Sequence, residues 1–271
     1  MEHYIWLAIL GFIIGTYGTL IGAGGGFVLV PILLILYPGE NPDMITSISL
    51  AVVFFNSASG SYAYARMKRI DYKSGLLFGL ATIPGAIFGA LSTSYIPRQI
   101  FDITLGILMI GASIFLLFYS NKNRKIKEKI SKYCLKRKII DKDGITYTYS
   151  YNIVTGIGLS LFISFISSFL GIGGGIIHVP VLAQVLNFPV HIATATSHFV
   201  LVIITLTGTI VHIAEGSFTY GIHRTAALAI GVLIGAQLGA VLSKRIRGKW
   251  IIKGLAIGLA FVGIRLLFMV L

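Results

Sequence analysis

A cluster of four glycines within five residues occurs twice in this chain, each time between two apolar stretches. The first copy reads L-I-G-A-G-G-G-F-V-L-V-P from Leu20 to Pro31, and the second reads L-G-I-G-G-G-I-I-H-V-P from Leu170 to Pro180. Glycine is costly inside a helix, so each cluster predicts a helix that breaks and then restarts. The matching glycines, at an offset of 149 residues, are Gly22, Gly24, Gly25 and Gly26 in the first copy and Gly171, Gly173, Gly174 and Gly175 in the second.

A broken helix leaves backbone N–H groups unpaired at the start of its second half. Those N–H groups and the helix dipole both favour a bound negative charge. In a bilayer, such a break is tolerated only where protein or a water-filled cavity covers it. Two breaks at corresponding places in two halves of a chain are a sequence indication of a transporter binding site.

The composition indicates an integral membrane protein. Hydrophobic residues make up 56% of the chain and charged residues 11%, whereas soluble domains carry roughly 25% charged residues. The net charge is +13, but residues 121–149 alone hold ten basic and three acidic residues. The other basic residues lie in short loops, where they act as topology signals rather than as a nucleic-acid surface. The single cysteine, Cys134, excludes an intrachain disulfide, and the acidic N-terminus is unlike a cleavable signal peptide.

The apolar stretches divide the chain into two copies of one unit. A spanning helix needs about 20 residues, so the two stretches that follow the glycines are too short to span and are expected to be re-entrant half-helices. Beyond them the match continues at an offset of 150. Thr46-Ser47 aligns with Thr196-Ser197, and Gly89-Ala90 aligns with Gly239-Ala240. We therefore predict a first repeat at 1–120, a basic linker at 121–150 and a second repeat at 151–271. The apolar stretches are 4–21, 26–37, 44–65, 74–93, 100–119, 151–170, 175–187, 192–214, 225–242 and 250–270.

The loop charges favour inverted rather than parallel repeats. Basic residues follow the third stretch of the first copy, at 66–73, but in the second copy they follow the fourth stretch, at 244–253. Basic loops stay in the cytoplasm. The sequence thus predicts an all-α protein of two inverted repeats, each a glycine-tipped re-entrant hairpin plus three transmembrane helices. Both termini are expected outside the cell membrane and the linker inside. Within the linker, Ile126, Ile130 and Tyr133 indicate a short amphipathic helix, and Asp143-Gly144 indicates a β-hairpin between 139 and 149.

The duplicated GxGGG-(x)4-P unit, the Thr-Ser dipeptides and the paired Gly-Ala motifs resemble the TauE/SafE family of sulfite and organosulfonate permeases. The resemblance covers both halves and leaves out the linker. It implies a secondary carrier for sulfur-containing anions such as sulfite, sulfonates or thiosulfate. The chain lacks the pair of cysteines of the related thiosulfate-uptake branch, which argues against relay chemistry on thiols.

The glycine clusters and several polar residues are the candidate substrate-binding groups. Gly24, Gly25, Gly173 and Gly174 are expected to leave room for an anion beside the backbone, whereas Gly85, Gly89, Gly235 and Gly239 suit close helix packing. The Thr-Ser dipeptides are either helix N-caps or anion ligands, and Asn56, a primary amide in apolar surroundings, needs partners. The predicted substrate-binding residues are Gly24, Gly25, Gly26, Gly173, Gly174, Gly175, Thr46, Ser47, Asn56, Thr196 and Ser197.

Histidine is the only titrating side chain that the sequence places at membrane depth. None of the nine acidic residues lies in the middle of an apolar stretch, whereas His178, His198 and His212 lie in such stretches. These three histidines are candidates for proton coupling, against the alternative of neutral histidines satisfied by hydrogen bonds.

The sequence thus predicts a small-anion permease that works by alternating access and is not an enzyme. The anion is expected between the two half-helix N-termini, with no cofactor, no metal and no nucleic acid involved, and membrane lipid as the surroundings. A passive anion channel and a carrier of another anion, such as a carboxylate, are the alternatives. A membrane-embedded enzyme is disfavoured because no Ser-Lys dyad, GxSxG elbow or buried metal cluster is apparent. The sequence does not specify the oligomeric state.

Overall fold

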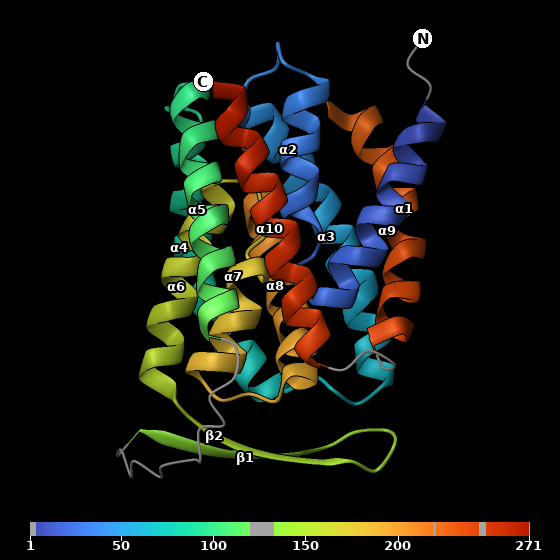
Figure 1. Cartoon of the computed structure of the whole chain (residues 1–271), viewed down its shortest axis with the longest axis vertical. Coiled ribbons are helices and arrows are strands. Elements are labelled where there is room, and N and C mark those ends of the chain that lie inside the picture. The colour runs from blue at the N-terminus through green and yellow to red at the C-terminus, as the bar shows by residue number, and fades with distance from the viewer. Residues whose placement is uncertain (1–3, 120–132, 219–220, 244–247, 271) are drawn as a thin grey trace.

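The computed structural model describes residues 4–119, 133–218, 221–243 and 248–270, which form an upright bundle of helices with a β-hairpin across one end (Figure 1). The first half contains α1 (Tyr4–Ile21), α2 (Gly26–Leu36), α3 (Pro42–Arg66), α4 (Tyr72–Thr93) and α5 (Arg98–Tyr119). The second half contains α6 (Ile153–Phe169), α7 (Gly175–Pro180), the π-helical turn η1 (Val181–Val185), α8 (Val190–Ala214), α9 (Ile222–Ser243) and α10 (Gly248–Val270). The strands β1 (Cys134–Ile140) and β2 (Thr146–Asn152) lie between the halves.

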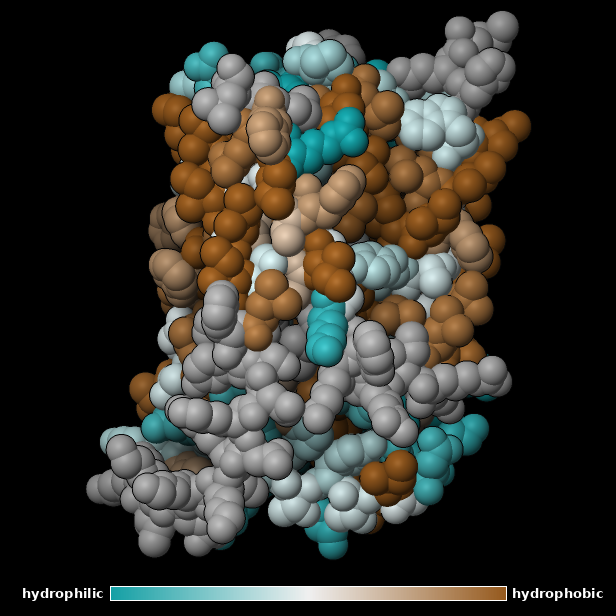
Figure 2. Space-filling view, viewed as in Figure 1, coloured by the Kyte–Doolittle hydropathy of each residue, from teal (hydrophilic) through white to brown (hydrophobic). Residues whose placement is uncertain are grey.

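The outer surface of the bundle is apolar, as expected for a protein that faces lipid. Five of the described helices, α1, α3, α4, α8 and α9, are long and apolar enough to cross a membrane. Large apolar side chains such as Ile13, Phe88, Phe162 and Ile230 are more than half exposed, and in Figure 2 apolar residues cover most of the upper part of the bundle. So large an exposed apolar area is unstable in water but stable against hydrocarbon. The chain is a multi-pass membrane protein.

Small residues let helices of one half pack closely on helices of the other. Gly85 and Gly89 of α4 approach the backbone carbonyls of Leu161 and Phe165 on α6 so closely that a methyl group would clash. In the same way Gly235 and Gly239 of α9 lie against the carbonyls of Phe12 and Thr16 on α1. The predicted packing role of the four Gly-Ala-motif glycines is therefore confirmed, and it interlocks the two halves.

The predicted β-hairpin is present and covers the end of the bundle opposite the N- and C-termini (Figure 1). Strands β1 and β2 pair antiparallel, with Ile140 opposite Thr146, and Gly144 adopts a positive φ in the turn. Tyr149 and Tyr151 are 3% exposed and pack in an aromatic cluster against the bundle. The predicted amphipathic helix falls almost wholly at 120–132, outside the described residues.

The structure changes the alignment of the third helices of the two halves. Helices α3 and α8 each have 25 residues and begin at Pro42 and Val190, an offset of 148. The expected alignment of Thr46-Ser47 with Thr196-Ser197 is therefore wrong. The loop before α3, at 37–41, is one residue longer than the loop before α8, at 186–189, and the offset returns to 150 only at α4 and α9.

Candidate functional site

Both glycine clusters break their helices, as the sequence predicts. At the first cluster Gly24 and Gly25 adopt φ of 76° and 85°, and at the second Gly173 and Gly174 adopt φ of 77° and 89°. Only glycine adopts this region readily. Gly25 and Gly174 are the residues directly before α2 and α7. Each pair of glycines with positive φ therefore ends one helix and sets the direction of the next.

The two breaks touch each other through their backbones. A methyl group added at Gly26 would lie 2.8 Å from the carbonyl oxygen of Ile172, and one added at Gly175 would lie 2.6 Å from that of Gly22. The residues at both breaks are buried. We call the two breaks, residues 22–26 and 171–175, the first and second tips. Their contact explains why the third glycine of each run is needed although its φ is helical.

Each tip carries a run of successive buried N–H groups that have no acceptor among the described residues. In the first tip and its helix start they belong to Gly25, Gly26 and Phe27, and in the second to Gly173, Gly174, Gly175 and Ile176. The next N–H groups along α2 and α7 bond back to the carbonyls of Gly25 and Gly174. Buried N–H groups without partners are rare and costly. Seven of them meeting at two helix starts form an environment that suits an anion.

In this conformation apolar side chains occupy the space next to the tips. Methyl groups added at Gly24 and at Gly173 would each lie 2.7 Å from Cγ1 of Val53 on α3, and the one at Gly24 would also lie 2.6 Å from Leu201 on α8. The expected room for an anion at these two glycines is thus filled by side chains from the central helices. Ligand entry at this point requires the side chains of Val53 and Leu201, or the helices that carry them, to move.

A directional chain of hydrogen bonds holds the first tip. The Asn56 amide nitrogen donates to the carbonyl of Gly24 at 2.8 Å, which fixes the orientation of the amide. Thr19 must then donate its hydroxyl proton to Asn56 Oδ1, at 3.1 Å. His198 Nε2 lies 3.2 Å from the same hydroxyl oxygen, which has no second proton, so His198 is the donor there and carries its proton on Nε2. Asn56, Thr19 and His198 are all fully buried.

Serine hydroxyls cross-link each tip to a central helix of the other half. Ser49 of α3 donates to the carbonyl of Gly171 at 2.7 Å, and Ser197 of α8 donates to that of Gly22 at 3.4 Å. Ser49 and Ser197 are 148 residues apart, so these bonds are equivalent in the two halves. At the second tip, the buried Ser167 hydroxyl has no partner among the described residues and lies beside Gly174.

The remaining candidates from the sequence lie in several different places. Thr46 and Ser47 bond to carbonyls three residues earlier in α3, and Thr196 accepts from the Asp71 N–H. None is an N-cap, because Asn41 and Pro189 occupy those positions. The N-cap interpretation of the dipeptides is therefore wrong.

The three candidate histidines lie in different parts of the structure. His178 is fully buried in α7, with Nε2 at 3.3 Å from Ser160 Oγ and its ring edge-on to Phe78. His198 belongs to the chain of bonds at the first tip. His212 lies away from both tips, at the end of α8, with Nδ1 at 3.0 Å from Asp43 Oδ1.

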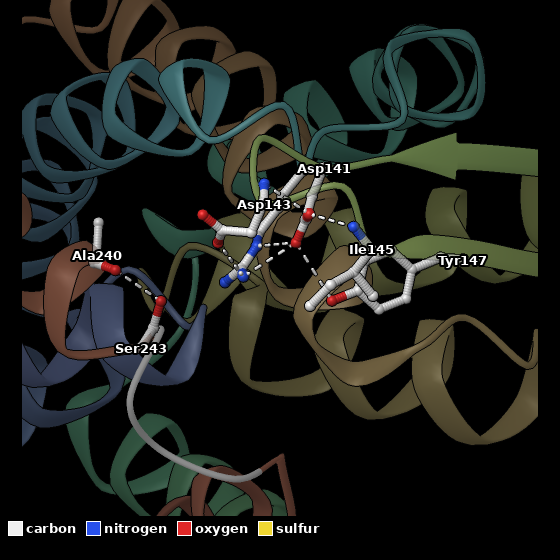
Figure 3. Close-up of polar contacts among 7 residues, drawn as sticks. Asp141, Asp143, Ile145, Tyr147, Ala240 and Ser243 are labelled. Atoms are coloured by element: carbon white, nitrogen blue, oxygen red, sulfur yellow. Dashed lines mark hydrogen bonds and ion pairs between the residues drawn. The ribbon is translucent and has the colours of Figure 1, made fainter.

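Ion pairs from two arginines, which sequence reasoning missed, fasten the hairpin to the loop between α3 and α4. The guanidinium of Arg69 bonds to Asp141 Oδ2 at 3.2 Å and lies 3.7 Å from Asp143 Oδ2. Figure 3 shows the carboxylates of Asp141 and Asp143 turned toward the same guanidinium. Arg137 donates from Nε to Asp71 Oδ2 at 2.9 Å. The sequence shows these residues only as loop charges and as part of a turn, because partners 66–74 positions apart leave no local pattern.

The electrostatics of the Asp71 pair favour its charged form. Burial by itself raises the pKa of the Asp71 carboxyl, but hydrogen bonds from Arg137 and Tyr149, among others, hold that pKa below its ordinary value of 3.8. The same carboxyl accepts the Ser74 N–H and so caps α4. The ion pairs and the aromatic cluster close the hairpin end of the bundle.

An apolar helical bundle whose two broken helices meet in its interior belongs to the class of polytopic membrane transporters. A comparison with family models matches residues 7–266 to the family described as "Sulfite exporter TauE/SafE". The chain therefore belongs to the TauE/SafE family, and its family and relatives are transporters rather than enzymes.

The relatives are similar over almost their full lengths. "Probable membrane transporter protein YunE" of Bacillus subtilis (strain 168) is 34% identical over 98% of this chain and 97% of the relative. "Probable membrane transporter protein MJ0441" of Methanocaldococcus jannaschii is 28% identical over 90% of this chain and 87% of the relative. "Probable membrane transporter protein YdhB" of Bacillus subtilis is 29% identical over 86% of each. No solved structure matches this chain significantly.

Proposed function

We propose that this protein is a secondary carrier for a small sulfur-containing anion such as sulfite or an organosulfonate. The observation that carries the proposal is the meeting of two helix starts with seven buried N–H groups that lack acceptors among the described residues. The description of the family as sulfite exporters supports the choice of a sulfur oxyanion. An anion held by N–H groups and helix dipoles needs no full positive charge, so it can be released to the other side.

The hydroxyls nearest the tips complete the proposed site. Ser167 is buried beside Gly174 with no partner among the described residues, and an anion at the second tip gives it an acceptor. Ser49 and Ser197 bond to tip carbonyls, so in this conformation they position the backbone rather than face a ligand.

We propose further that the two halves are inverted repeats of 1–120 and 151–271 joined by the linker at 121–150. Helices α3 and α8 hold equivalent places in the two halves, yet they run antiparallel. Asp43 near the start of α3 contacts His212 near the end of α8, whereas Asp71, just after α3, bonds to Thr196 near the start of α8. Antiparallel equivalent helices support inversion. Under the positive-inside rule, the positive charge on the hairpin supports a cytoplasmic location for that end, and with it the proposal that both termini lie outside the cell membrane.

Alternating access suits the structure better than a channel. A channel needs a continuous path, but Val53 and Leu201 fill the space beside the tips and the hairpin covers one end of the bundle. A carrier passes through such a closed state between its two open states. Flux measurements in liposomes separate the two, since a carrier saturates and exchanges labelled for unlabelled anion.

Proton coupling, if present, falls to His178 and His198, the two fully buried histidines closest to the tips. His198 already uses Nε2–H in the chain of bonds to Gly24, so proton uptake occurs at Nδ1 and leaves that chain intact. Replacing His198 or His178 by Gln should abolish the pH dependence of uptake while exchange persists in part. Unchanged pH dependence in both variants removes histidine from the mechanism and favours Na⁺ coupling or none.

The proposed substrate class is tested with sulfite, taurine, sulfoacetate, thiosulfate, sulfate, acetate and succinate on purified protein. A ligand that binds the folded state raises the melting temperature. The expected result is stabilisation by sulfite or a sulfonate, followed by saturable counterflow of the same anion in proteoliposomes. Stabilisation and counterflow by the carboxylates alone contradict the sulfur-anion assignment, and non-saturating flux contradicts the carrier.

A further inference from the structure

Three side chains with metal-binding donor atoms meet at the end of the bundle opposite the hairpin. They are Asp43 from the first turn of α3, His212 from the last turn of α8 and Glu215, the residue after α8. One donor atom from each lies within 4.8 Å of the other two. The group is remote from the tips and takes no part in the proposed anion site.

The histidine of this cluster is fully buried, with one ring nitrogen beside a carboxylate and the other without a partner. His212 is 0% exposed, and its Nε2 has no hydrogen-bond partner among the described residues. Its Nδ1 lies 3.0 Å from Asp43 Oδ1, within ion-pair distance if the imidazole is protonated. Donor atoms around a tetrahedral Zn²⁺ with bonds of about 2.0–2.1 Å lie roughly 3.3 Å apart. A fully buried imidazole in that arrangement indicates a ligand.

The surroundings leave room for an ion and its remaining ligands. A cavity of about 360 Å³ lies beside the cluster and is lined by Asp43, Gly216 and Ser217, among others. Glu215 is exposed, and its carboxylate accepts a long hydrogen bond of 3.4 Å from Ser94. Its carboxylate can therefore turn toward His212 at little cost.

The cluster is not a by-product of the internal repeat. The equivalent positions in the other half, at the offset of 148 set by α3 and α8, hold His191, Tyr64 and Met67. Only one end of the bundle thus carries the three ligands, and sequence reasoning missed them because they come from the opposite ends of two helices.

We infer that Asp43, His212 and Glu215 bind a divalent transition-metal ion, with Zn²⁺ as the best fit. One imidazole and two carboxylates suit Zn²⁺, whereas Ca²⁺ and Mg²⁺ prefer all-oxygen sites. This inference revises the sequence expectation that no metal is involved, and it stands independently of the proposed anion transport.

The test is isothermal titration of Zn²⁺ into tag-free, chelator-treated full-length protein in detergent. Wild type should bind one Zn²⁺ saturably and melt at a higher temperature with it. Glu215→Gln, a change at an exposed residue, should weaken binding by at least about 10–100-fold, the loss seen even for residues that only support metal ligands. His212→Gln should do the same, and its metal-free melting temperature reports whether it folds.

His191→Gln is the matched control, because His191 is a half-buried histidine at the start of the same helix and outside the cluster. It should bind Zn²⁺ like wild type. The inference is overturned if wild type shows no saturable Zn²⁺ binding, or if Glu215→Gln binds as tightly as wild type. A loss in His191→Gln equal to that in Glu215→Gln also overturns it, because binding is then not confined to the cluster.

Discussion

Replacing Asn56 by Ala tests whether the first tip is held in place for a ligand. The amide links Gly24 to Thr19 through two hydrogen bonds, of 2.8 and 3.1 Å, in a fully buried site. Alanine removes both bonds and leaves the Gly24 carbonyl without its partner. Of the side-chain hydrogen bonds to the carbonyls of the first tip, the weaker one from Ser197 to Gly22, at 3.4 Å, then remains.

The magnitude follows from measured hydrogen bonds inside membrane proteins, which average about 0.6 kcal/mol and reach about 1.7 kcal/mol each. Two bonds therefore cost about 1–3 kcal/mol of stability. The effect on binding has a different origin. If the loosened tip loses one N–H bond to a bound anion, worth about 1.5–3 kcal/mol, affinity falls about 10- to 100-fold.

The assay measures anion affinity and the unliganded melting temperature of the same preparations. Ser57→Ala is the matched control, because Ser57 is the neighbouring buried residue but bonds only to Phe54 within its own helix. Asn56→Ala should bind at least tenfold more weakly than Ser57→Ala. Equal affinities in the two variants refute the reasoning. A lower melting temperature with normal affinity would show that Asn56 contributes to the stability of the fold but not to anion binding.

Three further predictions concern topology, the tips and the hairpin. An impermeant thiol reagent added outside cells should spare the exposed native Cys134 and label Ser94→Cys made in a Cys134→Ser background; the reverse pattern contradicts cytoplasmic placement of the hairpin. Gly25→Ala should lower the melting temperature, since φ is 85° and the methyl meets Ile14 at 2.6 Å, whereas Gly158→Ala, in open space on α6, should be neutral or stabilising by about 0.5–1 kcal/mol. The depressed pKa of Asp71 gives stability that is present above 3.8 and lost as pH falls through the folded pKa. The stability advantage of wild type over Asp71→Asn should therefore shrink as pH is lowered below 3.8, and a constant difference contradicts the pairing.

The sequence predicted those features that arise from local backbone requirements. Runs of glycine specify a break whatever surrounds them, and Asp143-Gly144 specifies a tight turn, so the tips and the hairpin could be located from their residues alone. Gly85 and Gly89 likewise predicted close packing, because a spacing of four places both on one helix face.

Features that depend on register between distant segments could not be predicted in this way. Thr-Ser occurs by chance at an offset of 150, but the extra residue in loop 37–41 sets the structural offset to 148. Hydroxyls are frequent in apolar helices because they bond to their own helix, so a recurring dipeptide there is weak evidence of equivalence. The pairing of Arg69 with Asp141 depends on where the hairpin folds back, which neither segment encodes alone.

Polar contacts at both ends and tip contacts in the middle make α3 and α8 the natural moving parts of the proposed carrier. The Asp71 N–H bonds to Thr196 at 3.1 Å near the hairpin end, and His212 lies 3.0 Å from Asp43 at the other end. Between them, Val53 of α3 contacts both tips. In the proposed carrier, opening toward one side would break the contact at that end while the contact at the other end keeps the helices together. If the inferred metal ion binds at Asp43 and His212 in the proposed carrier, it would strengthen one end only and would favour opening at the hairpin end.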